Sequence, residues 1–505
     1  MKLVFSIILF NLNFGFSQIN NTVESPDFTR SKSESFNGFI GETDLAIFTI
    51  DYIYSSKKKK ELIARKFFKS DLVLMQETNI FKSPLDGYYS EPYEVYFIND
   101  KLYLFSIFTH IKEQTTTLGL FIFSESLKLQ QFEIVDSIAN VNQTNIIIKP
   151  SHDKKALIIV QSHPHSNTRK QVVDLNCLNL SGQSVWKKEL ISFNTVSKIN
   201  IESIEFPTNK EIYILCNYGF NTVNSQNNQV KLLTNKYTLW VYNHSLNFLK
   251  EVDLKLKLKW INGVDIKLKP NGNLIVAGYV NSTRDFAIDA FFNIELNKKY
   301  EVINNNYYKF SKEEVQLFLL KGSKKKQLNN YYLRELIILN DGSFYLLGEH
   351  FDTYLDRVFD PRTNTTRTVE HFNYDYIISA YFDSLGHCSW IKRIPKIQNS
   401  TNDGGYYSSF SVFSKESEVY LVYNDHEKNI DYISDDLEYL KAMFNNKHSA
   451  ITQVTIQTNG NIKKQHLSPK SRYYLYAKKS KSINTETMYL LLESGRKAKI
   501  LGLDL

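Results

Sequence analysis

The chain has 505 residues, a length that one ordinary hydrophobic core seldom serves, so several domains or a repeated architecture are expected. Apolar residues make up 42% and charged residues 23%, which argues against a disordered chain. The net charge of +8 comes from scattered lysines and short runs such as residues 57–60. No basic stripe interleaved with aromatic residues is present, so nucleic acid is not an expected partner.

The first residues carry one lysine, an apolar run and then Gly15-Phe16-Ser17, a small-x-small pattern that a signal peptidase can cut. We therefore expect a signal peptide over residues 1–17, a linker over 18–36, and export through an inner membrane to the periplasm or the exterior. The apolar run is short for a bilayer, and no later run is long enough. No membrane span is expected in the mature chain.

Residues 37–505 are predicted to be all-β, because Phe, Trp and Tyr reach 14% and β-branched residues are frequent. Two stretches match nearly position for position: "LKPNGNLIVAGY" (268–279) and "LNDGSFYLLGE" (339–349). Asn-Gly and Asp-Gly between apolar stretches are strong hairpin signals. Five weaker copies bring the total to seven, at residues 98–108, 150–161, 206–219, 413–425 and 483–494.

A second hairpin follows most copies of the first, and in two places it reads [DN]-x-x-G-x-x-x-W. These are "CLNLSGQSVW" (177–186) and "YFDSLGHCSW" (381–390). The glycine is expected to form the turn. The tryptophan is expected to begin the outer strand and to pack between neighbouring sheets.

Four strands per unit, repeated every 50 to 75 residues, indicate a β-propeller. We predict a single propeller of about seven four-stranded blades; six or eight also fit the spacing. Six blades would begin near residues 95, 145, 200, 260, 330 and 406. The seventh would combine residues 473–505 with strands of the N-terminal segment, which would close the ring and leave no open edge.

The tryptophan turn is loosely similar to the docking turn of quinoprotein propellers, but it lacks one residue between Asp383 and Gly386. Quinone chemistry is therefore not expected, and no cofactor is predicted. Signal peptide, composition and degenerate blades together make the chain resemble the secreted β-propeller proteins of Bacteroidota. That resemblance implies fold and export, and it brings no catalytic residues with it.

Function is expected on one face of the propeller. The long insertions fall between the second and third strands, at residues 162–171, 217–236, 349–373 and 424–448. Long loops on a rigid scaffold usually carry binding. Tyrosine pairs precede several innermost strands and would form an aromatic rim at the channel mouth, suited to a sugar ring or a peptide; they are Tyr88, Tyr89, Tyr331, Tyr332, Tyr406, Tyr407, Tyr473 and Tyr474. The alternative is that they are a repeated packing position.

No nucleophile elbow, phosphate loop or paired-cysteine metal motif is present, and no catalytic residue is assigned. Two polar groupings are not expected to bind a metal, so none is predicted. No third ligand accompanies His163 and His165, and the grouping of Glu349, His350, Asp352 and Asp356 lacks the Asp-x-Asp spacing and turn glycine of a calcium loop. The sequence favours a binding module for a glycan, a peptide or an envelope protein. The alternatives are a carbohydrate-active enzyme with carboxylates in the central channel, and an envelope scaffold.

Overall fold

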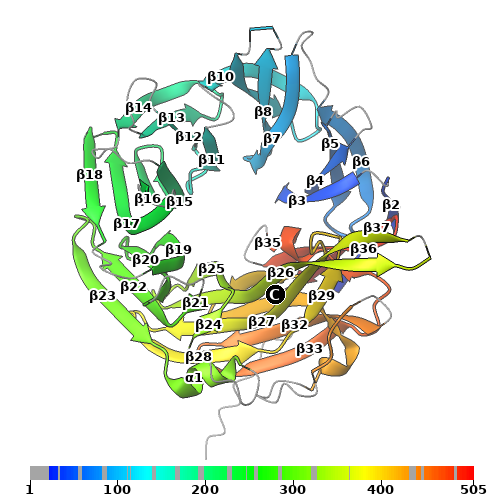
Figure 1. Ribbon diagram of the computed structural model, residues 1–505. Helices are drawn as coiled ribbons and strands as arrows, with labels where there is room; N and C mark the ends of the chain where they lie inside the picture. Colours follow the sequence, from blue (N-terminus) through cyan, green and yellow to red (C-terminus); the bar gives the residue numbers. More distant parts are fainter. Residues whose placement is uncertain are drawn as a thin grey trace, which may run out of the picture.

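The protein is described here from a computed structural model (Figure 1). The described residues are 22–31, 34–54, 60–81, 88–110, 112–113, 115–138, 144–164, 171–191, 198–223, 230–245, 247–254, 260–282, 287–319, 327–362, 364–431, 440–444, 448–482 and 486–504. The expected signal peptide, residues 1–17, lies outside them. Within the described residues, no helix is both long enough and apolar enough to cross a membrane.

The first four sheets follow one another along the chain, and each is an antiparallel four-stranded meander. Sheet 1 contains β3 (Glu34–Glu42), β4 (Ala46–Tyr54), β5 (Lys60–Phe68) and β6 (Leu74–Phe81). Sheet 2 contains β7 (Tyr88–Ile98), β8 (Lys101–His110), β9 (Thr116–Phe123) and β10 (Leu129–Ile138). Sheet 3 contains β11 (Asn145–Pro150), β12 (Ala156–Pro164), β13 (Gln171–Asn179) and β14 (Ser184–Ile191). Sheet 4 contains β15 (Lys198–Thr208), β16 (Glu211–Val223), β17 (Val230–Asn243) and β18 (Phe248–Asp253).

The next three sheets repeat the same order. Sheet 5 contains β19 (Trp260–Leu268), β20 (Leu274–Asn281), β22 (Ala290–Leu296) and β23 (Val302–Lys309). Sheet 6 contains β25 (Tyr331–Ile338), β26 (Phe344–Asp360), β27 (Thr365–Phe382) and β28 (Cys388–Ile394), with β29 (Gln398–Thr401) added to β27. Sheet 7 contains β30 (Ser411–Lys415), β31 (Glu418–His426), β32 (Ser449–Gln457) and β33 (Ile462–Ser468). Short elements between sheets 5 and 6 are β21 (Ala287–Ile288), helix α1 (Lys312–Leu317) and β24 (Leu328–Asn329).

Sheet 8 is built from both ends of the described chain. Its C-terminal part contains β34 (Tyr474–Leu475), η3 (Ala477–Lys479), β35 (Lys481–Ser482), β36 (Thr487–Ser494) and β37 (Lys497–Asp504). Its outermost strands are β1 (Thr22–Glu24) and β2 (Phe28–Thr29), which both pair antiparallel with β37. Within residues 18–36, which were expected to be a linker, β1 and β2 belong to the last sheet and residues 34–36 already begin β3 of sheet 1.

The sheets are arranged around a central opening as in a β-propeller, with β3, β7, β15, β19 and β25 on the inside (Figure 1). Each pair of consecutive sheets packs through its own apolar cluster, for example sheets 3 and 4 through Val160, Trp186 and Ile214. One such cluster joins sheet 8 to sheet 1, where Phe36 and Phe67 meet Tyr476 and Ile500. The all-β prediction is confirmed, and the expected starts near 95, 145, 200, 260, 330 and 406 fall close to β7, β11, β15, β19, β25 and β30.

Among the described residues, six sheets are four-stranded, and two larger ones also contain a four-strand path. The segment expected to complete the last unit instead forms sheet 1 by itself. Its first hairpin turns at Thr43–Leu45 without an Asn-Gly or Asp-Gly pair, and the Thr43 hydroxyl accepts a hydrogen bond from the Ala46 backbone N–H at 3.2 Å. Because that turn uses a threonine side chain, the glycine-based hairpin pattern does not detect it.

The two tryptophan turns behave as predicted. Gly182 and Gly386 have φ of +82° and +83°, a conformation that glycine adopts without strain. The Trp186 indole N–H donates to the Asn209 carbonyl at 2.7 Å, and the Trp390 indole N–H donates to the Thr458 carbonyl at 2.8 Å. Each acceptor lies in the next sheet, so the repeated spacing ties one sheet to its neighbour.

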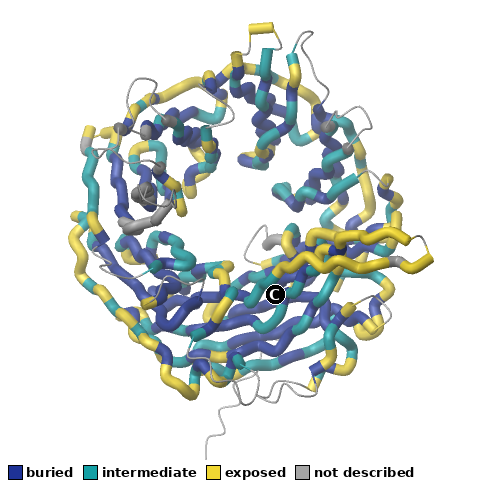
Figure 2. The backbone as a smooth tube through the Cα atoms, viewed as in Figure 1, coloured by how far each residue is buried: buried dark blue, intermediate teal, exposed yellow. Residues whose placement is uncertain are grey.

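The long insertion at 349–373 is mostly a two-stranded extension of sheet 6 and not an irregular loop. Register between β26 and β27 continues from Phe344–Phe382 to Asp360–Thr365. Figure 2 shows the far half of this hairpin as exposed, and Leu355 and Phe359 are 69% and 56% exposed. The insertion at 217–236 likewise extends β16 and β17.

Cys177, Cys216 and Cys388 are all free, and burial raises the pKa of the Cys177 and Cys388 thiols to about 12. Burial also raises the pKa of Cys216. Because only the thiolate reacts, we expect a thiol reagent at pH 8 to modify the native protein about a thousandfold more slowly than the urea-unfolded protein. Stoichiometric, rapid labelling of the native protein would contradict this assignment.

Candidate functional site

A cavity of about 620 Å³ occupies the centre of the ring. Its wall takes residues from six successive sheets, from sheet 3 to sheet 8; they include His152, Glu205, Lys267, Glu335, Phe410 and Lys478. A second cavity of about 990 Å³ is lined mainly by sheets 1 and 2 and shares His152 with the first. The central opening therefore presents polar and charged side chains from all round the ring.

The most buried acid of the first cavity is Glu205 on β15, which is 3% exposed. Its Oε2 lies 2.7 Å from His152 Nε2, and its Oε1 lies 3.7 Å from Lys267 Nζ. Burial opposes the charge of Lys267, but the carboxylates of Asp265 and Glu205 outweigh that effect and raise its pKa. Glu205 Oε1 is buried and accepts no hydrogen bond, which is unusual for a carboxylate oxygen.

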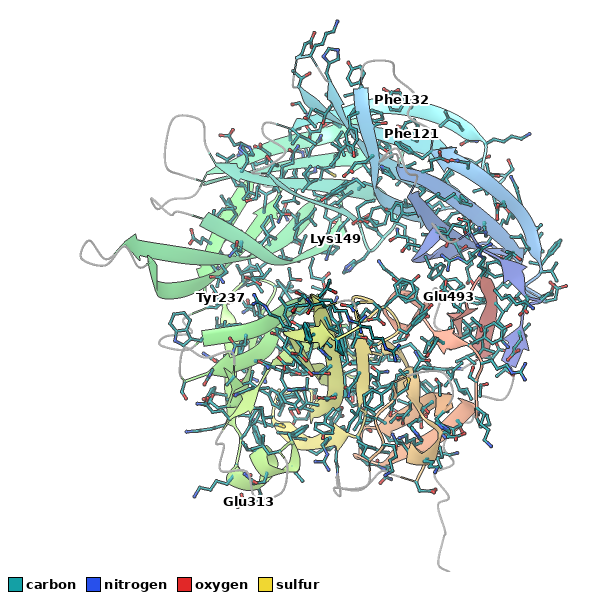
Figure 3. The ribbon with its side chains drawn as sticks, turned by 45° about the vertical axis from the view of Figure 1, so that its right-hand side comes forward. Phe121, Phe132, Lys149, Tyr237, Glu313 and Glu493 are labelled. Carbon is teal, nitrogen blue, oxygen red and sulfur yellow. The ribbon has the colours of Figure 1, made fainter. Side chains whose placement is uncertain are left out.

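Side chains also join the inner strands of neighbouring sheets. The Tyr93 hydroxyl of β7 donates to the Ile146 carbonyl of β11 at 2.5 Å. The Lys149 ammonium, on the inner side of the ring in Figure 3, donates to the Ile204 carbonyl of β15 at 2.9 Å. Burial lowers the pKa of Lys149. These contacts fix the relative positions of the inner strands that form the cavity wall.

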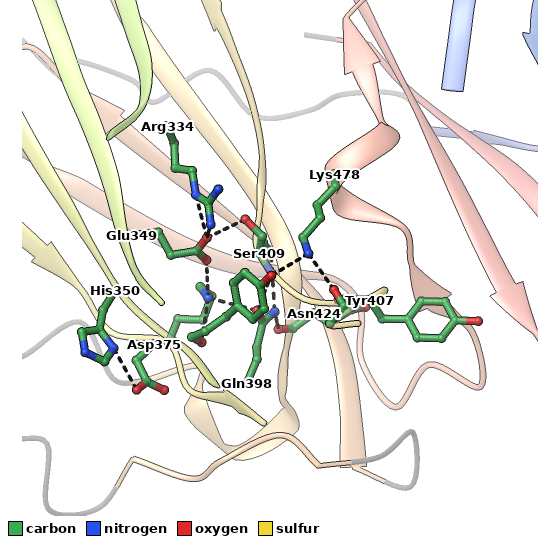
Figure 4. Close-up of polar contacts among 12 residues, drawn as sticks. Arg334, Glu349, His350, Asp375, Gln398, Tyr407, Ser409, Asn424 and Lys478 are labelled. Atoms are coloured by element: carbon green, nitrogen blue, oxygen red, sulfur yellow. Dashed lines mark hydrogen bonds and ion pairs between the residues drawn. The ribbon is translucent and has the colours of Figure 1, made fainter. Parts of the chain in front are cut away.

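A buried ionic network lies where sheets 6, 7 and 8 meet (Figure 4). At its centre is Glu349 of β26, whose side chain is fully buried. Its Oε1 lies 2.8 Å from Lys396 Nζ, and Lys396 is fully buried as well. Its Oε2 accepts from Arg334 Nε and Nη2 at 3.1 and 3.0 Å, and from the Ser409 hydroxyl at 2.6 Å. Glu349 is thus held by three partners, Lys396, Arg334 and Ser409.

The segment before β30 is shaped by the same network. Ser409 has φ of +78°, which strains a residue other than glycine and persists only when its surroundings hold it. Its backbone N–H donates to Gln398 Oε1 at 2.8 Å, and Gln398 Nε2 donates to the Asn424 carbonyl at 2.7 Å. Residues next to a strained backbone are candidates for function.

Lys478 of η3 reaches this network from sheet 8. Its ammonium donates to the Tyr374 hydroxyl at 2.8 Å and to the Gly405 carbonyl at 2.9 Å. Burial of the ammonium and the nearby Arg334 lower the pKa of Lys478 to about 8. The residue as a whole is exposed and lines the 620 Å³ cavity. A lysine with a lowered pKa at a cavity wall is a recognised mark of a functional site.

Three of the predicted tyrosines come together beside Lys478. Tyr407 stacks on Tyr474 with ring centroids 4.7 Å apart, and Tyr406 packs edge-on against Tyr407. Tyr406 also stacks on Tyr476 at 3.9 Å. The Tyr407 hydroxyl donates to Glu493 Oε2 at 3.1 Å, and burial raises the pKa of Tyr407 to about 12.

The other predicted tyrosines lie apart from this group. Tyr331 is 3% exposed and packs in the core between sheets 5 and 6, so its ring is not presented to a ligand. Tyr332 and Tyr89 are 41% and 51% exposed, and Tyr88 packs edge-on against the His110 ring. The Tyr473 hydroxyl donates to Asp27 in the N-terminal segment. The eight tyrosines therefore do not form one continuous rim.

The polar grouping around Glu349 is divided among different partners. His350 lies 3.2 Å from Asp375, and Asp352 accepts a hydrogen bond from Asn330. His163 pairs with Asp174 at 2.8 Å, while His165 lies outside the described residues. In the part of the chain that the structure describes, no three of these residue types converge on a metal site.

No protein-family model matches the chain, and no curated protein matches it. Among solved structures, the β-propeller domain of the Trilobed protease from Pyrococcus furiosus is 10% identical at a TM-score of 0.36, covering 82% of this chain and 93% of that one. Prolyl oligopeptidase B from Galerina marginata is 10% identical at a TM-score of 0.41, covering 92% and 56%. This chain thus spans little more than half of the latter protein. At these scores the likeness supports no statement about function.

Proposed function

We propose that the protein is an exported, eight-bladed β-propeller that serves as a binding module and takes its ligand into the central cavity. The wall of that cavity supports the proposal, because six sheets contribute to it and both acidic and basic side chains line it. Glu205 carries the argument: it is a buried carboxylate at the cavity wall, and one of its oxygens accepts no hydrogen bond. A ligand that donates hydrogen bonds, such as a glycan or a peptide, would satisfy that oxygen.

The blade count and the closed ring rest on packing. Apolar clusters join each sheet to the next, and the cluster between sheet 8 and sheet 1 links the last unit to the first. The pairing of β1 and β2 with β37 places the N-terminal segment on the outer edge of the last blade. Export is supported by the sequence of residues 1–17 alone.

A binding screen with glycans and peptides tests the function. We expect the Glu205→Gln protein to bind the selected ligand at least about tenfold more weakly, the usual effect of losing a charged hydrogen-bond partner. Glu313→Gln is the matched control, since Glu313 is exposed on α1 outside the ring (Figure 3), and it should bind as the unaltered protein does. A folded Glu205→Gln protein with unchanged affinity would move the site away from this cavity.

A carbohydrate-active enzyme is the second candidate, because two carboxylates, Glu205 and Glu335, line the same cavity. If it applies, a bound glycan is turned over, and either Glu205→Gln or Glu335→Gln abolishes turnover while the Glu313→Gln protein stays active. Stable binding without turnover favours the binding module. Co-purification with one protein and no glycan or peptide binding would favour an envelope scaffold.

A further inference from the structure

Two cationic side chains from different sheets, Arg334 and Lys478, lie over the same aromatic ring, that of Tyr374. The Arg334 Cζ of β25 lies 6.0 Å from the centroid of the Tyr374 ring, and the Lys478 Nζ of η3 lies 4.4 Å from it. Figure 4 shows both side chains reaching the same part of the network from opposite sides. Like charges that approach each other in a partly buried place repel unless an anion lies between or beside them.

The acids near these two cations do not fully balance them. The charged groups that act on Lys478 are Arg334, Glu349, Asp403 and Lys396. With Lys478 itself, these most influential groups are three cations and two anions. Arg334 repels Lys478 more strongly than either acid attracts it, which matches the lowered pKa of the lysine.

Neither acid is free to move to Lys478. Glu349 is held by Lys396, Arg334 and Ser409. Asp403 accepts from the Ser400 hydroxyl at 2.6 Å and from the Gly405 backbone N–H at 2.9 Å. Among the described residues, Lys478 makes hydrogen bonds to Tyr374 and Gly405 but no ion pair. Within the described part of the chain, no carboxylate therefore contacts the Lys478 ammonium.

Both cations can be reached from solvent. Lys478 lines the 620 Å³ cavity, and the side chain of Arg334 is 33% exposed. Only two of the three guanidinium nitrogens of Arg334 contact Glu349. A planar guanidinium beside an ammonium is a common arrangement for holding the oxygens of a carboxylate or a phosphate.

We propose that Arg334 and Lys478 form an oxyanion-binding subsite beside the central cavity, which Lys478 lines, and that this subsite takes a carboxylate or phosphate group of the ligand. This inference rests on the proposed binding function and specifies that the ligand carries a negatively charged group. Glu205 would receive a hydrogen-bond donor of the same ligand elsewhere in that cavity.

The test measures how fast each lysine is acylated by acetic anhydride, read by peptide mass spectrometry, with sodium acetate or inorganic phosphate added separately. We expect either anion at about 20 mM to slow acylation of Lys478 at least fivefold, because a neighbouring anion favours the unreactive ammonium. Lys497, an exposed lysine of β37, should react at the same rate throughout. Protection by acetate alone assigns a carboxylate, and protection by phosphate alone assigns a phosphate group.

Protection should depend on pH and on Arg334. Lys478 carries its charge below about pH 8, so protection is expected to be strong at pH 7 and to weaken as the pH rises to 9. The Arg334→Gln protein should lose protection, whereas Arg357→Gln, an arginine on the exposed part of β26, should keep it. Equal protection in both variants, or none by either anion in the unaltered protein, would overturn the subsite.

A second variant, Lys478→Met, keeps the proposal testable if the Arg334→Gln protein does not fold. We expect phosphate or acetate to raise the melting temperature of the unaltered protein and to have no such effect on Lys478→Met, since a ligand stabilises only the fold that binds it. A shift of equal size in Lys478→Met would overturn the proposal. Anion protection in a protein that binds no glycan or peptide would retain the subsite and reject the ligands of the proposed function.

Discussion

Replacing Arg30 by alanine is expected to lower the free energy of unfolding by about 3 to 5 kcal/mol, the usual cost of removing one partner from a buried ionic network. Arg30 follows β2 and is 5% exposed. It pairs with Asp51 of sheet 1 and Glu493 of sheet 8, so one side chain joins the first and last sheets to the N-terminal segment. Without it both carboxylates stay buried, although Arg65 still lies 2.6 Å from Asp51.

Denaturant unfolding measures this effect, with Arg496→Ala as the control. Arg496 lies in the turn between β36 and β37, and its side chain is exposed. Only its backbone carbonyl takes part in the contact, accepting from the Arg30 backbone N–H at 2.8 Å. The control should change stability by less than about 0.5 kcal/mol, as surface substitutions do. A loss below about 1 kcal/mol in Arg30→Ala would mean that the ring does not depend on this contact.

The repeat can be recognised in the sequence because each hairpin turn is determined by residues that are neighbours in the chain. The first hairpins of sheets 5 and 6 each turn on a glycine, Gly272 and Gly342, and both have positive φ. The glycine pattern fails where another residue stabilises the hairpin turn, as the Thr43 side chain does in sheet 1. It also fails for β1 and β2, which are too short to show strand periodicity and are strands only because β37 lies beside them.

The candidate site was less accessible to sequence reasoning, because its residues are distant in the chain. Glu349, Ser409 and Lys478 come from three different sheets, and no short motif contains any two of them. Tyr406, Tyr407 and Tyr474 were found by their repeated position and do lie together. The same pattern also selected Tyr331, which packs in the core. Whether a tyrosine at the start of an inner strand packs into the core or faces outward depends on register, which the pattern does not reveal.

The second large effect is expected at the pair of Glu349 and Lys396. Both side chains are fully buried, so Lys396→Met leaves a carboxylate without its closest cation. It also leaves the Tyr374 carbonyl and Gln398 Oε1 without the hydrogen bonds that Lys396 donates at 2.9 and 3.0 Å. We expect a loss of about 3 kcal/mol, at the low end for a broken buried pair because Arg334 and Ser409 still hold Glu349.

A double-mutant cycle separates the pair from the rest of the network. Removing both charges with Glu349→Gln and Lys396→Met takes away the uncompensated charge that makes either single change costly. The double variant should therefore lose about 2 kcal/mol less than the sum of the two single losses in denaturant unfolding. Simple addition of the single losses would contradict direct coupling. In that case the strained backbone at Ser409 must be held by Gln398 and Asn424 and not by the ion pair.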